Sequence, residues 1–134
     1  MSLVKVISSG ALLCCLMGLP LAAQAKTFVV QTQNTSFVPG VVTIAAGDTV
    51  RWEWTSLVHT VTSGSGPSDP NVGSLFDAPL DSTHPVFIHR FTQVGSVSYF
   101  CRFHFLMGMT GTVVVQPATP AEMATWSAVK TLYR

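Results

Sequence analysis

A short segment with sulfur and imidazole side chains constrains the fold of this chain more than any other feature. Cys101, His104 and Met109 fall within nine residues of one another. Residues 96–100 before them and residues 112–115 after them are rich in the β-branched and aromatic types that favour strands. The pattern therefore predicts two strands joined by a tight loop at the rim of a sheet. A thiolate, an imidazole and a thioether on one loop suit a soft, redox-active metal, above all copper.

A second imidazole is needed to complete a copper site of this kind, and His59 can supply it. His59 lies between apolar and β-branched neighbours, in a second segment that predicts a strand. Two histidines and one cysteine in a plane, with a distant axial methionine, make a blue-copper electron-transfer site. Both Met107 and Met109 follow His104, so the residues alone offer two candidates for the axial ligand.

The first 25 residues predict an export signal. Lys5 gives a positive start, residues 6–21 are mostly apolar, and Ala23-Gln24-Ala25 is a small-x-small cleavage pattern. Polar residues, glycine and proline interrupt the apolar run, which argues against a stable membrane span. We therefore expect cleavage before Lys26 and a periplasmic or otherwise exported protein whose mature domain covers residues 26–134.

Charge and length narrow the classes of partner. Removing 25 of the 134 residues leaves 109, enough for one domain with one core. Lys5 leaves with the signal, so six basic residues face six acidic ones and the formal net charge is zero. No basic stripe recruits nucleic acid, and no acidic face steers a cationic partner. We expect a monomer that docks through apolar or short-range contacts.

Cysteine use also favours a metal site. Cys14 and Cys15 lie in the export signal and lack the small neighbours that a lipid-attachment motif requires, so Cys101 is the one cysteine of the mature chain. Exported proteins normally pair their cysteines, and an unpaired thiol needs an explanation. An inert, buried cysteine is the alternative. The nearby histidine and methionine favour metal binding instead.

Short strands separated by turns account for most of the mature chain and indicate a two-sheet antiparallel sandwich. Strict alternation places Val50, Trp52 and Trp54 on the buried face of one strand. Residues 34–40 read as a turn, and residues 63–85 as a long turn-rich loop with a short strand at residues 75–77. The other predicted strands are residues 27–33, 41–44, 49–54, 87–91 and 96–100.

The last segment changes to a helical period. Residues 119–122, Thr-Pro-Ala-Glu, form a capping box with proline at the first helical position. Met123, Trp126, Val129 and Tyr133 then recur at helical spacing and give one apolar stripe. We expect one short C-terminal helix within residues 117–134 that packs against the sandwich.

Two longer patterns resemble the cupredoxins, in particular the plastocyanin, halocyanin and pseudoazurin branch. The resemblance covers nearly all of the mature domain. The first pattern is Gly47-Asp48-Thr49-Val50-x-Trp52 followed by His59-Thr60-Val61, and the second is Gly95-x-Val97-x-Tyr99-x-Cys101-x-x-His104-x-x-x-x-Met109-x-Gly111.

The resemblance implies an all-β Greek-key sandwich of about eight strands with one copper ion at one end. It also implies a soluble one-electron carrier that shuttles between larger redox proteins. The implied ligands are His59, Cys101, His104 and Met109. Met109 is favoured because it stands five residues after His104, as in plastocyanin and pseudoazurin, whereas the spacing of Met107 is that of amicyanin-like members.

Two positions beside the ligands depart from the common pattern of the family. Phe103 stands where relatives often have proline, and we hypothesise that its backbone N–H donates to the Cys101 sulfur. Thr60 stands where relatives often have asparagine bridging the two ligand loops, and its hydroxyl is a candidate substitute. The apolar side chains near His104 are candidates for a docking patch: Phe103, Phe105, Leu106 and Met107.

Three other functions are compatible with some of these residues. Copper storage or delivery is the strongest, since cysteine, histidine and methionine also bind Cu(I). Zinc in the same pocket would be colourless and redox-silent. An enzyme is disfavoured, because Phe100 and Arg102 flank Cys101 where copper oxidases and nitrite reductases carry further histidines. His84 is expected to be solvated and His89 to be a structural, partly buried residue.

Overall fold

The computed structural model describes residues 24–118 as a β-sandwich. Residues 1–23 and 119–134, which carry the expected export signal and C-terminal helix, lie outside the described residues. The elements are nine strands and one 3-10 turn: β1 Thr27–Gln33, β2 Ser36–Val38, β3 Val41–Ala45, β4 Thr49–Glu53, β5 His59–Ser63, β6 Asp77–Leu80, β7 Val86–Arg90, β8 Gly95–Phe100, η1 Phe105–Met107 and β9 Thr110–Gln116.

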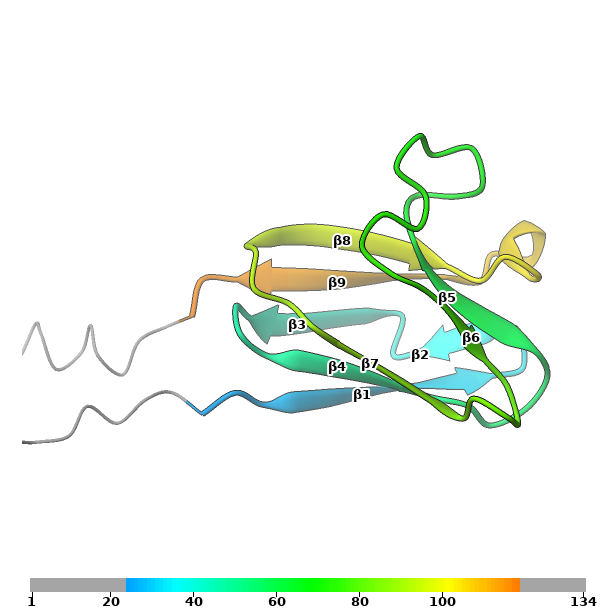
Figure 1. The fold of residues 1–134 in the computed structure, drawn as a ribbon, viewed down its shortest axis with the longest axis horizontal. Helices are drawn as coiled ribbons and strands as arrows, with labels where there is room; N and C mark the ends of the chain where they lie inside the picture. The colour runs from blue at the N-terminus through cyan, green and yellow to red at the C-terminus, as the bar shows by residue number, and fades with distance from the viewer. Residues whose placement is uncertain (1–23, 119–134) are drawn as a thin grey trace, which may run out of the picture.

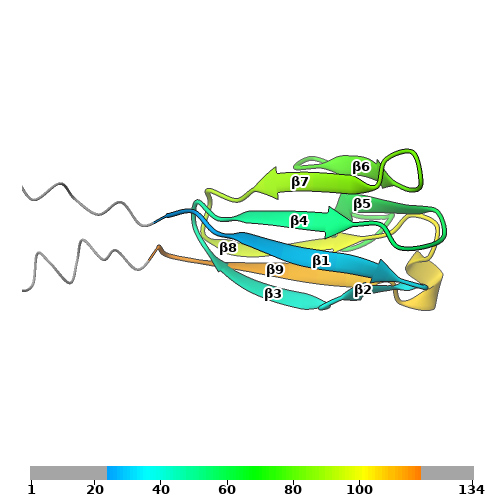
Figure 2. The same cartoon turned by 90° about the horizontal axis from the view of Figure 1, so that it is seen from below.

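The strands form two layers, as Figures 1 and 2 show. One sheet has the order β2-β1-β4-β7, and the other has the order β3-β9-β8-β5-β6. The predicted all-β two-sheet class is confirmed. The predicted antiparallel pairing does not hold at two places, because β1 pairs with β4 and β3 pairs with β9 in parallel. The chain moves between the sheets before returning, so sheet neighbours come from distant segments.

Two predicted element boundaries also differ. Ser36–Val38 forms the short strand β2 inside the expected turn, and it pairs back onto β1. The short strand expected at residues 75–77 begins at its last residue, Asp77, instead. The reason is local: the hydroxyl of Ser63 accepts the N–H groups of Leu75 and Phe76, so these N–H groups bond to a side chain rather than to the carbonyl groups of a neighbouring strand.

Large aromatic side chains fill the space between the sheets. Trp52 is fully buried, as its alternation predicts, and its ring centroid lies 5.3 Å from Tyr99 and 5.6 Å from Phe76. Because Trp52 belongs to β4 and Tyr99 to β8, this contact joins the two layers. Burial of each such ring contributes about 1.5–3 kcal/mol. The rigid interior fixes where the strands end.

Gly111 is explained by its neighbour across the sheet. It pairs with Tyr99 between β8 and β9, and a side chain at residue 111 would overlap the Tyr99 ring. The absence of a Cβ therefore lets the tyrosine lie flat over β9. Cys101 and Met109 lie two residues beyond this pair, so the close contact sets the positions of both at the end of the sheet.

The loop that carries the candidate ligands lies at one pole of the sandwich. β8 ends and β9 begins there, and η1 lies between them, whereas the described chain ends at residues 24 and 118 lie at the opposite pole (Figure 1). His59 opens β5 at the ligand pole (Figure 2). Among residues 24–118 there is no helix long and apolar enough to span a membrane.

Candidate metal centre

The loop from Cys101 to Met109 is closed by backbone hydrogen bonds. The Cys101 N–H donates to the Met109 carbonyl at 3.1 Å, and the Met109 N–H donates to the His104 carbonyl at 3.2 Å. His104 caps the 3-10 turn η1, which ends at Gly108 in the left-handed region at φ 81°. Glycine adopts this conformation without steric cost. The loop therefore presents Cys101 and His104 from a fixed backbone.

The segment before β5 fixes the ring of His59. This ring is fully buried, and its Nε2 lies 2.8 Å from the Ser56 carbonyl oxygen. Nε2 must carry a proton to donate there, so Nδ1 is left as the free donor atom toward the site. Leu57, between them, has φ 63° and accepts a hydrogen bond from the Trp54 indole. A non-glycine residue in this region is uncommon and marks a constrained turn.

Sequence reasoning did not identify this turn. Alternation predicts a packing role for Trp54, and nothing in the sequence marks Ser56 or Leu57 as supports of a ligand. The one available signal is the position of Trp54 at the end of its strand, where an indole N–H often finds a carbonyl partner.

Three side chains from the two segments converge. Cys101 Sγ lies 3.8 Å from His59 Nδ1 and 3.5 Å from His104 Nδ1, and the three donor atoms all lie within 4.8 Å of one another. Metal–nitrogen bonds of about 2.0–2.1 Å and metal–sulfur bonds of about 2.3 Å require nitrogen–sulfur separations of about 3.6–3.8 Å at tetrahedral to trigonal angles. The observed spacings therefore fit a single ion.

The surroundings of His59 favour its neutral form. Burial lowers the pKa of His59, the hydrogen bond with Ser56 raises it, and the charge of neighbouring His104 lowers it further, with a net lowering. A neutral imidazole has the lone pair that a metal needs. His59 thus meets the electronic requirement of a ligand as well as the geometric one.

The two methionines lie in different environments. Met109 is fully buried in the core, whereas the side chain of Met107 is 69% exposed. Two imidazole nitrogens, a thiolate and a buried thioether are the donor set that suits copper. His84 is exposed and lies 3.2 Å from Asp81, and His89 is half-buried with its ring 4.8 Å from Phe91. Both histidines are therefore placed as expected, outside the cluster.

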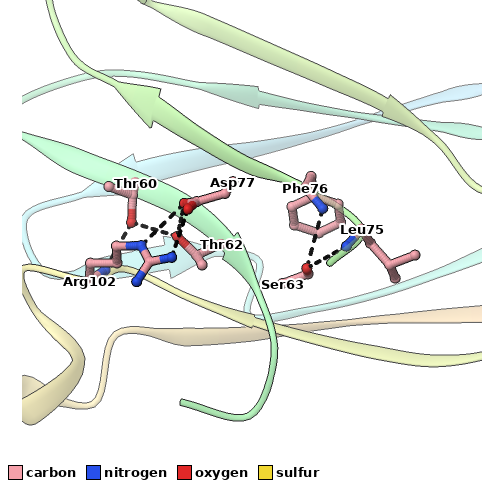
Figure 3. A network of polar contacts seen from close by, with 7 residues as sticks. All are labelled: Thr60, Thr62, Ser63, Leu75, Phe76, Asp77 and Arg102. Carbon is pink, nitrogen blue, oxygen red and sulfur yellow. Dashed lines mark hydrogen bonds and ion pairs between the residues drawn. The ribbon is translucent and has the colours of Figure 1, made fainter. Parts of the chain in front are cut away.

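Thr60 joins the two ligand segments. Its hydroxyl accepts a hydrogen bond from the Arg102 N–H at 2.9 Å, so the residue after His59 is tied to the residue after Cys101 (Figure 3). The bridging role expected for the Thr60 hydroxyl is present. The hydrogen bond expected from the Phe103 N–H to the Cys101 sulfur is not among the hydrogen bonds within residues 24–118. The hypothesis that this N–H donates to the sulfur therefore lacks structural support.

Large apolar side chains are exposed on both ligand segments. Three of the four expected ones are largely solvent-exposed, whereas Phe105 packs on Phe100 with ring centroids 5.3 Å apart. The turn before His59 adds two that sequence reasoning missed. The exposed fractions are Phe103 64%, Leu106 97%, Met107 69%, Leu57 51% and Val58 55%.

A two-sheet sandwich with imidazole, thiolate and imidazole donors meeting at one pole defines a mononuclear copper protein of the cupredoxin class. A family model described as copper binding proteins of the plastocyanin/azurin family matches residues 24–116. The chain belongs to this family, and copper is its cofactor. The resemblance inferred from the motifs around residues 59 and 101 is confirmed.

Solved structures support the fold. The oxidised plastocyanin of Dryopteris crassirhizoma is 21% identical, with 66% of this chain and 100% of that chain covered and a TM-score of 0.55. A reduced amicyanin variant with proline replaced by phenylalanine is 26% identical, with 67% and 82% covered and a TM-score of 0.53. An oxidised amicyanin variant with methionine replaced by leucine is 24% identical, with 66% and 80% covered and a TM-score of 0.54.

Proposed function

We propose that this protein is a one-electron carrier with a type 1 copper site formed by His59, Cys101, His104 and Met109. The carrying observation is that the Nδ1 atoms of His59 and His104 lie 3.8 and 3.5 Å from the Cys101 sulfur, at the spacing that one shared ion requires. Met109, rather than Met107, is the proposed axial ligand because it is the buried one of the two. The burial of Met109 supports the choice made from spacing.

The chain contributes a fixed geometry. Bound copper supplies the Cu(I)/Cu(II) couple. The aromatic core, the Ser56 hydrogen bond to His59 and the closed loop hold the donor atoms in place, so gain or loss of an electron requires little movement of the protein. Burial of His59, Cys101 and Met109 keeps water away from one side of the site.

The proposed contact surface for redox partners surrounds His104. That ring is only half-buried, and the apolar side chains of Phe103, Leu106 and Met107 are exposed beside it. Exposed apolar patches mark docking sites. A plastocyanin of fern has been described in both oxidised and reduced forms, which supports a redox role for that relative. With a mature net charge of zero, we expect association with the larger donor and acceptor proteins to depend weakly on salt.

Export and processing complete the proposal. We propose that residues 1–25 are a signal, that the mature domain is residues 26–134, and that a helix at the C-terminus covers part of residues 117–134. The Lys26 N–H donates to the buried Asp48 carboxylate at 2.8 Å, and its carbonyl accepts from the Thr49 N–H at 2.9 Å. Cleavage before Lys26 would therefore leave the first residue of the mature chain attached to the sandwich.

The proposed role involves no enzymatic turnover. Copper enzymes that couple two metal centres use further histidines beside the cysteine, and here Arg102 follows Cys101 and binds Asp77 instead. The protein is accordingly expected to pass electrons to partners rather than to convert a substrate itself.

Spectroscopy of the mature, copper-saturated protein tests the proposal. We expect an intense visible absorption band in the oxidised form that disappears on reduction and returns in air, together with a narrow copper hyperfine splitting in electron paramagnetic resonance. A colourless protein that releases Cu(I) rapidly to a chelator would instead support storage or delivery. The measurement uses no partner, so it tests the site before the pathway.

A further inference from the structure

Arg102, the residue after Cys101, is held at both its backbone and its side chain. Its N–H donates to the Thr60 hydroxyl at 2.9 Å. Its guanidinium binds both carboxylate oxygens of Asp77 on β6, with Nε 3.2 Å from Oδ1 and a terminal nitrogen 2.7 Å from Oδ2 (Figure 3). This two-point contact fixes the direction of the arginine more tightly than a single ion pair does.

A buried threonine closes a ring of hydrogen bonds, called the circuit below, which runs from Arg102 through Thr60, Thr62 and Asp77 back to Arg102. Thr62 is fully buried, and its Oγ1 lies 2.8 Å from Asp77 Oδ1 and 3.0 Å from Thr60 Oγ1. A hydroxyl has one proton and an ionised carboxylate only accepts, so Thr62 donates to Asp77. Thr60 then donates to Thr62, and its lone pair remains directed at the Arg102 N–H. The circuit starts and ends at Arg102.

The position of Asp77 is itself fixed from β5. Ser63 Oγ accepts the N–H groups of Leu75 and Phe76 at 3.1 and 3.3 Å, and the Ser63 N–H donates to the Phe76 carbonyl at 2.9 Å. Asp77 pairs with Thr62 in the β5–β6 register. Figure 3 shows these contacts side by side along β5. The backbone at the acidic end of the circuit is therefore held by the strand framework.

We propose that Thr62 and Asp77 are positioning residues of the copper site. They act through Thr60 and Arg102, which directly follow His59 and Cys101, and they hold the thiolate at a constant separation from the buried imidazole. This inference rests on the proposed type 1 site. Loss of the circuit widens the range of thiolate–imidazole separations, which alters the copper–sulfur bond and slows electron exchange.

The test replaces Thr62 with valine, which keeps the shape of the side chain and removes the hydroxyl. Thr62→Ser restores the hydroxyl, and Thr32→Val is the matched control, because Thr32 is also fully buried and its hydroxyl accepts the Thr55 N–H in the other sheet. In the metal-free protein, exchange of the Arg102 amide hydrogen is followed by NMR. In the oxidised copper protein, the copper hyperfine splitting and the ratio of the charge-transfer bands are recorded.

Thr62→Val removes both hydrogen bonds of the Thr62 hydroxyl, so the Thr60 hydroxyl is no longer held toward the Arg102 N–H. We expect exchange of the Arg102 amide to become about fivefold faster and both copper signatures to change. Thr62→Ser should return all three toward the wild-type values, and Thr32→Val should leave exchange of the Arg102 amide unchanged while lowering stability. Wild-type Arg102 exchange and copper spectra in Thr62→Val would overturn the inference.

A second variant keeps the inference testable where Thr62→Val fails to fold. Asp77→Asn lies at a half-exposed side chain and loses the ion pair to Arg102, so the same changes are expected in smaller measure. Unchanged copper spectra in that variant would also overturn the inference. A wild-type protein without the blue band would refute the proposed function itself, and this outcome is separate from the comparison among variants.

Discussion

His59 and His104 are the same side chain at nearly the same distance from one sulfur, yet they lie in opposite environments. His59 is fully buried, and its second nitrogen is held by the Ser56 carbonyl at 2.8 Å. His104 is half-buried and caps a 3-10 turn whose three residues are not buried. One histidine belongs to the framework and the other to the surface. The pair shows how a site can be rigid and reachable at once.

The difference follows from the segments that carry them. The turn before His59 is fixed by the Trp54 indole and by a left-handed Leu57. Thr60, the residue after His59, accepts a hydrogen bond from the Arg102 N–H. The 3-10 turn that follows His104 is closed through its own backbone, and its three residues are not buried. Rigidity is thus concentrated on the His59 side, while the His104 side leaves an imidazole edge next to solvent.

Replacement of Cys101, whose sulfur lies close to both histidines, gives the largest predicted effect on the copper site. Cys101→Ser should abolish the intense visible absorption of the oxidised protein, because this absorption depends on the copper–thiolate bond. The fold should persist, since the replacement is nearly isosteric. Visible and circular dichroism spectra measure both. Met107→Leu is the control and should keep the colour; a blue Cys101→Ser variant would exclude Cys101 as the ligand.

Exogenous imidazole distinguishes the two histidines next. In His104→Gly, free imidazole should enter from solvent and restore most of the visible band. In His59→Gly, it should not, because the cavity is enclosed and loss of a large buried side chain costs about 2–5 kcal/mol of stability. Titration of both copper-loaded variants with imidazole measures this. Equal restoration would mean that the contrast in burial does not govern access.

The two methionines extend the same contrast to a smaller effect. Met109→Leu should raise the reduction potential, because loss of a thioether donor destabilises Cu(II) more than Cu(I). Met107→Leu should leave the potential unchanged, since that side chain is 69% exposed. Both swaps conserve volume and should cost less than about 1.5 kcal/mol of stability. Voltammetry decides, and a shift in the Met107 variant alone would reverse the axial assignment.

The sequence allowed prediction of the parts of the site that depend on residue type and spacing. Cys101, His104 and Met109 are close in the chain, so a tight loop between strands brings them together. The role of Ser56 was not predictable, because any residue offers a carbonyl and only the three-dimensional turn aims it at His59. The Asp77–Arg102 pair was not predicted for a related reason. The two residues are 25 positions apart in the chain, and the strand that begins at Asp77 was predicted with the wrong boundary.

The success of the fold prediction depended on whether a feature is local in the sequence. Alternation at Val50 and Trp52 identified the buried face correctly, because the period of a strand is a local property. Pairing between strands is not local, and the parallel contacts of β1 with β4 and of β3 with β9 were not visible in any single segment. Residue patterns therefore specified the layers but not the order of strands within them.

The stability of the protein in acid tests the Asp77–Arg102 ion pair, which supports the His59 side of the site. Arg102 holds the pKa of Asp77 below its ordinary value, with a further contribution from Thr62. A lowered folded-state pKa stabilises the protein at pH values above about 3.8, and this contribution disappears as pH falls through the folded-state pKa. In the metal-free protein, Asp77→Asn should therefore flatten the fall in urea midpoint below pH 4. The side chain is 42% exposed, so the effect should stay under about 1 kcal/mol.

Asp69→Asn provides the comparison for that experiment. Hydrogen bonds from the Ser65 and Asn71 backbones also lower the pKa of Asp69, which lies in a loop without contact to Arg102. Its replacement should flatten the acid profile as well but leave the copper spectra unchanged. An acid profile for Asp77→Asn identical to that of the wild type would show that the ion pair adds nothing to the framework.

The smallest predicted effect concerns the exposed face around His104 and its role in electron exchange. Cleavage of the proposed signal would leave a formal net charge of zero, so electron self-exchange between two copies should change little with salt. Leu106→Lys places a charge at the most exposed apolar residue beside His104. Where two copies meet through this face, like charges repel, so exchange should become slower at low salt and recover as ionic strength rises. NMR line broadening in mixtures of the oxidised and reduced protein measures the rate.

Val94→Lys is the matched control for Leu106→Lys, because Val94 is also exposed and precedes β8 at the pole opposite the site. The six residues of β8 separate the two poles by about 20 Å, well beyond the screening length of about 10 Å at moderate salt. Both variants carry the same added charge, so a difference in salt dependence isolates position from net charge. If both variants respond equally, electrons do not leave through the His104 face, and the contrast between the two histidines would concern stability rather than access.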